Sequence, residues 1–227
     1  MKRSMLHPGQ GLVEYGLIIL LVVLVALLVL SLSGVSLKDI YCFLAEKIGS
    51  RPVTCAASLF SDDFNDLSRW TVVSGKWEIK NGQLCTSQPG RIFVPIEDAD
   101  NYVIQLNGAK LDQGNGYGIY FRADNFKAVN GYTFQYDPGL QGFAFREWYQ
   151  GNEFSPSGLY RLPKTYDYYS APHDIKVVVQ GNSYTAFVDG QQVLSMSDST
   201  YTKGGIGLRT WDATVVCFDS ITVNRLP

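Results

Sequence analysis

Residues 116–148 read GYGIYFRADNFKAVNGYTFQYDPGLQGFAFREW, and apolar or aromatic side chains recur in them at every second position. This two-residue period is typical of a β-strand, because successive side chains of a strand point to opposite faces of its sheet. Short segments rich in Gly, Asn and Asp divide the stretch into three runs. The segment therefore predicts three consecutive strands, Gly116–Ala123, Gly131–Tyr136 and Gly142–Trp148.

The same alternation continues on both sides of this segment from Phe60 onward, and no helical pattern follows residue 57. The ten further candidate strands are Trp70–Val73, Lys76–Ile79, Gln83–Ser87, Arg91–Val94, Tyr102–Leu111, Asp174–Gln180, Ser183–Val188, Gln191–Met196, Gly205–Thr210 and Thr214–Asn224. Turns such as Lys80-Asn81-Gly82 and Val188-Asp189-Gly190 are hairpin signals. Many short strands at this spacing predict an all-β antiparallel sandwich over residues 58–227.

One face of these strands is consistently apolar and is expected to form the core. The predicted inward set is Ile119, Phe121, Tyr132, Phe134, Phe143, Phe145, Ile175, Val177, Val179, Ile206 and Leu208. The predicted outward set mixes aromatic rings with planar hydrogen-bonding groups, and consists of Tyr120, Arg122, Gln135, Arg146, Trp148, Arg209 and Trp211.

Several phrases resemble the concanavalin A-like jelly roll of the laminin-G and glucanase superfamily. They are Phe60-Ser61-Asp62-Asp63-Phe64, Trp77–Leu84, Gly118–Arg122, His173–Val177, Phe187–Gly190, Gly205–Arg209 and Phe218–Val223. The resemblance implies a jelly-roll β-sandwich and spans nearly all of residues 58–227. This fold carries lectins, hydrolases and structural modules alike, so fold alone does not assign an activity.

In that superfamily the concave face of the sheet is the usual saccharide site, so the resemblance implies that the outward set is a glycan-binding face. An alternative is structural: the segment Gly151–Pro172, which contains five aromatic residues, could cover these rings. The resemblance also places the first and last strands side by side. Asp62, Asp63 and Asp219 would then supply oxygen ligands for Ca²⁺, or else cap turns. No other cofactor is expected.

No enzyme activity is expected. Hydrolases of this fold carry an E-x-D-x-(x)-E pattern on one strand, and no strand here does; Glu147 and Glu153 stand alone. His173 follows Pro172 at a strand start and is expected at the surface. Nucleic-acid binding is disfavoured, since residues 58–227 hold 14 Lys and Arg against 18 Asp and Glu without a basic block.

The N-terminal part is of a different kind. Lys2 and Arg3 precede a long apolar run that reaches about Leu32, which is long enough to span a bilayer and lacks a small-residue cleavage site after it. The positive-inside rule places its N-terminus in the cytoplasm and the larger domain outside. Within this run Glu14 is unusual, because a carboxylate in an apolar helix is costly unless it is paired or reaches the head-group level.

Residues 9–18, which read GQGLVEYGLI, closely resemble the processing site of Flp/Tad-type type IV prepilins. The resemblance implies cleavage between Gly9 and Gln10 by a prepilin peptidase, which places Glu14 and Tyr15 at the fifth and sixth mature positions. Glu14 would then pair with the new α-amino group of a neighbouring subunit and fix the stagger of a helical filament.

The expected organisation is a leader at 1–9, a long hydrophobic pilin helix at 10–49, a linker at 50–57 and the sandwich at 58–227. The implied partners are other copies of the chain and the pilus assembly machinery, and the implied location is the inner membrane before assembly and an extracellular pilus after it. The expected function is a pilus subunit that displays a lectin-like domain for adhesion to surfaces or polysaccharide. Two alternatives are a membrane-anchored carbohydrate-binding protein that does not polymerise, and a pilin whose sandwich only coats the filament.

The four cysteines are Cys42, Cys55, Cys85 and Cys217, with no CxxC pair and no Cys/His cluster that would hold zinc. An even number beyond a membrane segment favours disulfides, of which three pairings are possible. The favoured one joins Cys42 to Cys55 and Cys85 to Cys217; four buried free thiols are the alternative.

Overall fold

A computed structural model of the chain describes residues 14–15, 17–21, 58–96, 99–124 and 126–226. Contacts divide the chain into two units, Met1–Ala56 and Ala57–Pro227. In the first unit, Glu14, Tyr15 and residues 17–21 are helical, and both named side chains are exposed. The predicted cleavage site at Gly9 and Gln10, the pair Cys42 and Cys55, and most of the predicted helix lie outside the described residues. Among those that are described, no helix is long and apolar enough to cross a bilayer.

The second unit is built almost wholly of strands. They are β1 (Ser58–Asp62), β2 (Thr71–Ser74), β3 (Trp77–Lys80), β4 (Gln83–Thr86), β5 (Gly90–Val94), β6 (Asn101–Gln113), β7 (Tyr117–Asp124), β8 (Asn130–Asp137), β9 (Gly142–Tyr149), β10 (Asn152–Glu153), β11 (Gly158–Arg161), β12 (His173–Gln180), β13 (Ser183–Val188), β14 (Gln191–Ser197), β15 (Gly205–Thr210), β16 (Val215–Phe218) and β17 (Ser220–Arg225), with one 3₁₀ turn, η2 (Pro138–Leu140).

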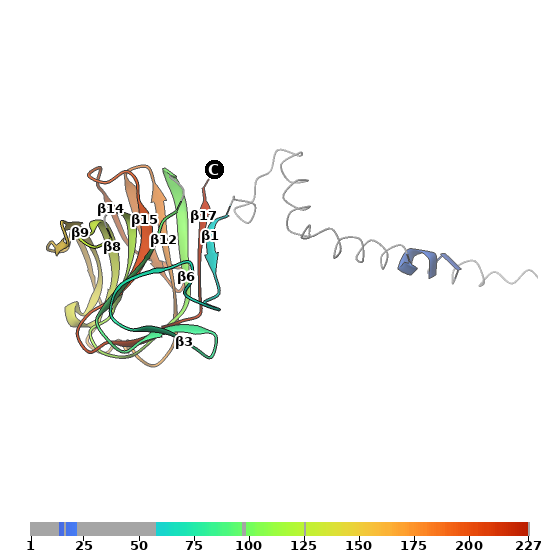
Figure 1. The fold of residues 1–227 in the computed structure, drawn as a ribbon, viewed down its shortest axis with the longest axis horizontal. Helices are drawn as coiled ribbons and strands as arrows, with labels where there is room; N and C mark the ends of the chain where they lie inside the picture. Colours follow the sequence, from blue (N-terminus) through green and yellow to red (C-terminus); the bar gives the residue numbers. More distant parts are fainter. Residues whose placement is uncertain (1–13, 16, 22–57, 97–98, 125, 227) are drawn as a thin grey trace, which may run out of the picture. The chain divides into compact units, whose positions relative to one another are not determined.

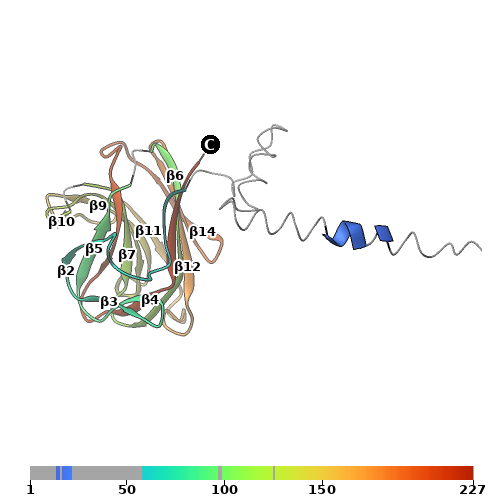
Figure 2. The ribbon, with the colours of Figure 1, turned by 45° about the vertical axis from the view of Figure 1, so that its right-hand side comes forward.

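The strands form two antiparallel sheets packed face to face (Figures 1 and 2), which confirms the predicted antiparallel jelly-roll sandwich. One sheet follows the order β14-β13-β12-β6-β16-β4-β3, and β17 joins it by pairing with both β6 and β1. The other follows β10-β9-β8-β7-β15-β5-β2, with β11 paired to β9. This second sheet, called the β7–β15 sheet below, carries every residue of the predicted outward set except Trp211, which comes directly after β15.

The core lies between the two sheets. Every residue of the predicted inward set is buried in one continuous cluster that also takes in Tyr102, Ile104 and Leu106 from β6. Aromatic rings dominate it, as in the stacked pair Tyr117–Tyr136 and the edge-to-face contact of Phe121 with Tyr184. Burying so many large rings is the principal favourable term in the folding of this domain.

Cys85 and Cys217 form a disulfide, as predicted, and they lie directly opposite each other on the neighbouring strands β4 and β16. The bond closes a loop of 132 residues between strands near the two ends of the domain. It therefore restricts the unfolded chain far more than it restricts the folded one.

All thirteen predicted strands are present, with one difference in the last of them. The run Thr214–Asn224 is interrupted at Asp219, so that β16 and β17 pair with different stretches of the long strand β6. The strand β1 pairs with β17, as the resemblance implies for the first and last strands, whereas β10 and β11 were not predicted. Both β10 and β11 fold back onto β9, and β10 places Glu153 on the β7–β15 sheet.

Candidate binding groove

A polar cluster centred on Glu153 lies on the outer face of the β7–β15 sheet. The Glu153 carboxylate accepts hydrogen bonds from Gln135 Nε2 and from Arg209 Nη1, and its Oε1 lies 3.5 Å from Arg146 Nε. Arg146 Nε also donates to Gln135 Oε1 at 2.9 Å. One carboxylate thus serves two guanidinium groups, and each planar group is fixed by its neighbours before any ligand arrives.

Arg209 is held between two indole rings. Its guanidinium carbon lies 4.5 Å from the centre of the Trp148 ring and 4.6 Å from that of Trp211. On the neighbouring strand it lies opposite Gly118, where a Cβ atom would come within 3.1 Å of Arg209 Cγ. The small residue on β7 therefore leaves room for the arginine to lie across the sheet.

Two adjacent hollows open on this face and share Arg209. The first, about 390 Å³ and called the Glu153 hollow, is lined by Asn115, Gln135, Asp137, Gly139, Leu140, Arg146, Glu153, Arg209, Trp211 and Asp212. The second, about 430 Å³ and called the Arg91 hollow, is lined by Ser74, Pro89, Gly90, Arg91, Trp148, Gly151, Arg209 and Thr210. The two hollows adjoin at Arg209, and together they are called the groove below.

The structure brings four predicted site residues together in the Glu153 hollow: Gln135, Arg146, Arg209 and Trp211. Tyr120 and Trp148 lie on the predicted face but are buried, 0% and 6% exposed respectively. They belong to a small second core with Phe93, Ala123 and Val129. Their rings are thus covered, as in the structural alternative, and the cover includes Val73 of β2 and Phe126 and Val129 from the loop between β7 and β8. From the segment Gly151–Pro172, Glu153 and Phe154 contact other residues of the outward set.

Arg122 was placed on the wrong face. The pairing of β7 with β8 shifts register between Phe121 and Asp124, and Arg122 itself has a positive φ of 49°. The side chain therefore turns away from the outer face, and its guanidinium lies 5.6 Å from the ring of Tyr184 in the main core. Counting alternate positions therefore gives the wrong face for a side chain at such a bulge.

Two functional candidates were missed by sequence reasoning, Glu153 and Asp137. Glu153 does not stand alone as expected, since the tight turn from β9 to β10 returns it beside Arg146. Asp137 caps the η2 turn by accepting the Leu140 amide at 2.8 Å, and it also lines the Glu153 hollow. Burial raises the pKa of the Asp137 carboxyl, although the Leu140 amide and Arg146 lower it in part.

The predicted calcium ligands do not form a site. Asp62 accepts hydrogen bonds from the Phe64 amide at 2.7 Å and the Trp70 indole at 2.9 Å, so it shapes a turn. Asp219 accepts a hydrogen bond from Gln83, and Asp63 is exposed. Among the described residues, no three acidic, histidine or cysteine side chains gather as metal ligands.

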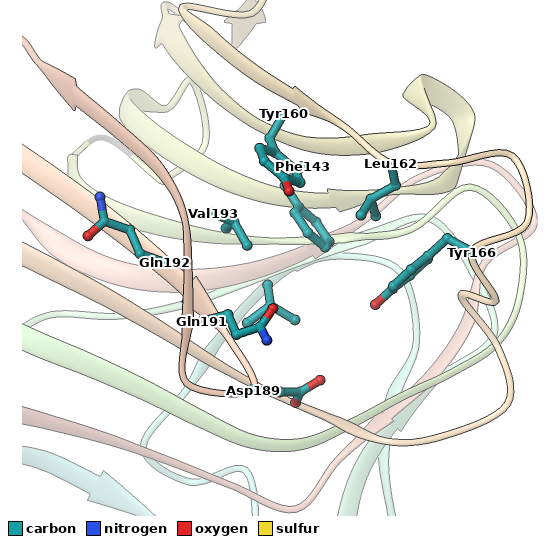
Figure 3. Close-up of a pocket in the computed structure, with 9 residues that line it drawn as sticks. Phe143, Tyr160, Leu162, Tyr166, Asp189, Gln191, Gln192 and Val193 are labelled. Atoms are coloured by element: carbon teal, nitrogen blue, oxygen red, sulfur yellow. The ribbon is translucent and has the colours of Figure 1, made fainter.

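A separate pocket of about 230 Å³ opens at the edge of the sandwich between β11 and the turn from β13 to β14. Figure 3 shows Phe143 and Tyr160 on one side of it and Asp189 on the other. Asp189 Oδ2 lies within hydrogen-bond distance of His173 Nδ1, at 2.6 Å, and the histidine side chain is only 12% exposed. His173 is therefore half-buried at the edge of the sandwich, and its expected surface position is met only in part.

A protein-family model described as the 3-keto-alpha-glucoside-1,2-lyase-like domain matches residues 56–224. The chain belongs to this family. The match covers both sheets, the disulfide and the residues of the groove, so the fold described above is that of a 3-keto-alpha-glucoside-1,2-lyase-like domain.

One curated relative of this lyase-like domain is a levanase of Bacillus subtilis (strain 168), 27% identical over 165 residues. The alignment covers 70% of this chain and 23% of the levanase, so the chain spans about a quarter of the length of the curated relative that it matches.

Solved structures with the same fold include both binding modules and hydrolases. The carbohydrate-binding module CBM66 from Bacillus subtilis aligns with a TM-score of 0.59 and 23% identity, covering 69% of this chain and 95% of the module. A prokaryotic β-1,3-1,4-glucanase (lichenase) from a mouse hindgut metagenome aligns with a TM-score of 0.55 and 14% identity, covering 75% of this chain and all (100%) of the enzyme.

Proposed function

We propose that the sandwich domain binds a glycan, and that the sugar occupies the Glu153 hollow. The observation that carries this proposal is the carboxylate of Glu153, held between Arg146 and Arg209 and bonded to Gln135 in an open hollow. Sugar hydroxyls both donate and accept hydrogen bonds, so they suit adjacent carboxylate, amide and guanidinium groups. The hollow also falls within the range of about 300–1,000 Å³ that is usual for small-ligand pockets.

The ring of Trp211 adds an apolar wall to this hollow. Trp211 is only partly buried, and one side of its ring is occupied by the guanidinium of Arg209. The C–H face of a sugar can stack on the part that remains accessible. The names of two relatives, a levanase and a carbohydrate-binding module, support the same class of ligand.

A glycan array with the full chain in detergent tests the proposal. Glu153→Gln replaces the carboxylate that contacts the Arg146 and Arg209 guanidinium groups with a neutral amide. Hydrogen bonds to charged groups contribute about 1.5–3 kcal/mol. We expect glycan affinity to fall at least about 10-fold. The matched control is Glu147→Gln, since Glu147 lies on β9 but does not line the groove. If the folded wild-type chain binds no glycan, or if Glu153→Gln binds as well as Glu147→Gln, the proposal fails.

We propose further that residues 1–57 display this domain as a subunit of a Flp/Tad-type pilus. The support is the run GQGLVEYGLI at residues 9–18 and the helical state of Glu14 and Tyr15. N-terminal sequencing of sheared surface filaments is expected to find Gln10 as the first residue, and Glu14→Ala is expected to abolish filaments. Retention of residues 1–9 in the membrane fraction would favour the anchored, non-polymerising alternative.

A second candidate function, cleavage of a glycosidic bond, is favoured by one observation. Asp137 and Glu153 line the same hollow, and burial raises the pKa of Asp137, as an acid catalyst requires. Incubation of the chain with glycans that it binds, followed by mass spectrometry, tests this function. Products that form with wild type and not with Asp137→Asn support it, and intact glycan after prolonged incubation rejects it.

A further inference from the structure

Two arginines face each other across the strands of the β7–β15 sheet. Arg91 on β5 and Arg209 on β15 are direct partners in the antiparallel register, and both line the Arg91 hollow. Side chains at directly opposed positions point to the same face of a sheet, and like charges placed there destabilise it. An arginine pair in this position therefore calls for a compensating negative charge.

The protein itself supplies too little of that charge. The Arg91 hollow has no acidic residue in its lining. Glu153 contacts Arg209 from the other hollow, but it also serves Arg146. Asp137 and Asp212 lie in the Glu153 hollow, where they accept hydrogen bonds from Leu140 and Asn115. Among the ion pairs of the described residues none involves Arg91.

Tyr120, which is close to both arginines, does not supply the missing charge. Its side chain is fully buried. Burial raises the pKa of Tyr120 to about 12, although the charges of Arg209 and Arg91 and a hydrogen bond with Arg91 lower it. The hydroxyl is therefore neutral and leaves the positive charge of the two guanidinium groups uncompensated.

We propose that the Arg91 hollow is an anion subsite, which takes the carboxylate or sulfate ester of an acidic sugar residue. The inference rests on the proposed function, because the neighbouring residue of the same glycan occupies the Glu153 hollow. The planar fork of each guanidinium matches a carboxylate or sulfate oxygen pair, and the anion removes the repulsion between Arg91 and Arg209. The groove thus binds a neutral sugar residue in the Glu153 hollow and an acidic one in the Arg91 hollow.

Calorimetric titration of the full chain in detergent tests this subsite. Three oligosaccharides of equal length are compared: a neutral one, one with a uronate residue and one with a sulfate ester. We expect at least one acidic ligand to bind about 10-fold or more tightly than the neutral one, with the advantage shrinking as salt is raised. The preferred ligand, uronate or sulfate, identifies the source of the anionic group.

Arg91→Gln is expected to remove this advantage while leaving the affinity for the neutral ligand unchanged. Arg91→Lys, which keeps the charge but not the fork, is expected to retain part of it. Arg69→Gln is the control, because Arg69 is exposed, donates to the Ser61 carbonyl and lines neither hollow. Since substitution at Arg91 relieves a like-charge contact, the thermal midpoint of ligand-free Arg91→Gln is expected not to fall.

The two proposals fail in different ways. If the neutral glycan binds and the acidic ligands show no advantage, or if Arg91→Gln keeps the full advantage, the anion subsite is overturned and the glycan-binding function stands. If no oligosaccharide of any charge binds the folded chain, both are overturned.

Discussion

Replacing Arg122 with methionine should destabilise the sandwich without weakening glycan binding. Arg122 is 2% exposed, and its guanidinium donates to four backbone carbonyls in three separate segments. It reaches Asp100 at 3.0 Å and Gly181 at 2.6 Å, and on the other side it reaches Thr202 and, at 3.3 Å, Tyr201. It therefore ties the start of β6, the β12–β13 turn and the approach to β15 to one another.

The size of the effect follows from these bonds. A hydrogen bond to a charged group contributes about 1.5–3 kcal/mol, but such values do not add within one network. Asp100, Gly181 and Thr202 are exposed residues, so water replaces part of what their carbonyls lose. Methionine also removes the cost of keeping a guanidinium out of water while retaining the apolar stem. We therefore expect Arg122→Met to lower the free energy of unfolding by about 2–4 kcal/mol.

Urea unfolding followed by tryptophan fluorescence measures this change. All four tryptophans lie in residues 58–227, so the signal reports the sandwich and not the N-terminal unit. Arg122→Lys, which keeps the charge with fewer donors, should fall between wild type and Arg122→Met. A midpoint within error of wild type would refute the structural role. A loss of glycan binding by Arg122→Met with unchanged stability would also refute it, since Arg122 would then contribute to the binding face.

Three further predictions concern the disulfide, the buried carboxyl and the packing of a glycine. The double variant Cys85→Ala/Cys217→Ala should lose about 2–5 kcal/mol in the same urea assay, because the bond closes a loop of 132 residues; a loss under about 1 kcal/mol would contradict this. The pKa of Asp137 in the folded chain is raised above 3.8, so between the unfolded and the folded pKa the unfolded chain binds fewer protons, and the free energy of unfolding falls as the pH rises. Asp137→Asn should lack this fall. If the free energy of unfolding of wild type and of Asp137→Asn changed in the same way with pH over that range, the assignment would be rejected. Gly207→Ala should cost about 1–3 kcal/mol, since its Cβ would lie 2.4 Å from Phe93 Cδ1, whereas Gly158→Ala, whose Cβ meets only Leu194 at 3.6 Å, should cost less than half as much.

The inner face of the sandwich could be predicted from the sequence because burial enforces the two-residue period there. A slip of one position would move Ile119 and Phe121 to the outer face of the sheet and a polar residue into the main core, so the alternation is kept wherever both sheets meet. The bond between Cys85 and Cys217 did not follow from the alternation; it belonged to the favoured one of three possible pairings, as a bridge between an early and a late strand, and the structure confirms it.

The outer face could be predicted only in part, because its residues are not held to that period. At Arg122 a bulge changes which face the side chain points to, and nothing in the local alternation marks the change. Tyr120 and Trp148 keep their predicted face but are covered by Phe126 and Val129, which come from a loop whose path depends on the whole sheet. Glu153 reaches the site through a two-residue strand that is too short to leave a periodic signal.

Arg209 explains why the groove has two unlike ends. Its guanidinium is fixed between two indole rings, so it cannot swing fully toward either hollow. On the side of the Glu153 hollow, the carboxylate of Glu153 pairs with both Arg209 and Arg146. On the side of the Arg91 hollow, Arg91 adds a further positive charge. The resulting gradient follows from three arginines and one shared carboxylate on a rigid sheet. A ligand that carries hydroxyls at one end and an anion at the other complements this gradient along the groove, whereas a uniformly neutral glycan leaves the repulsion between Arg91 and Arg209 in place.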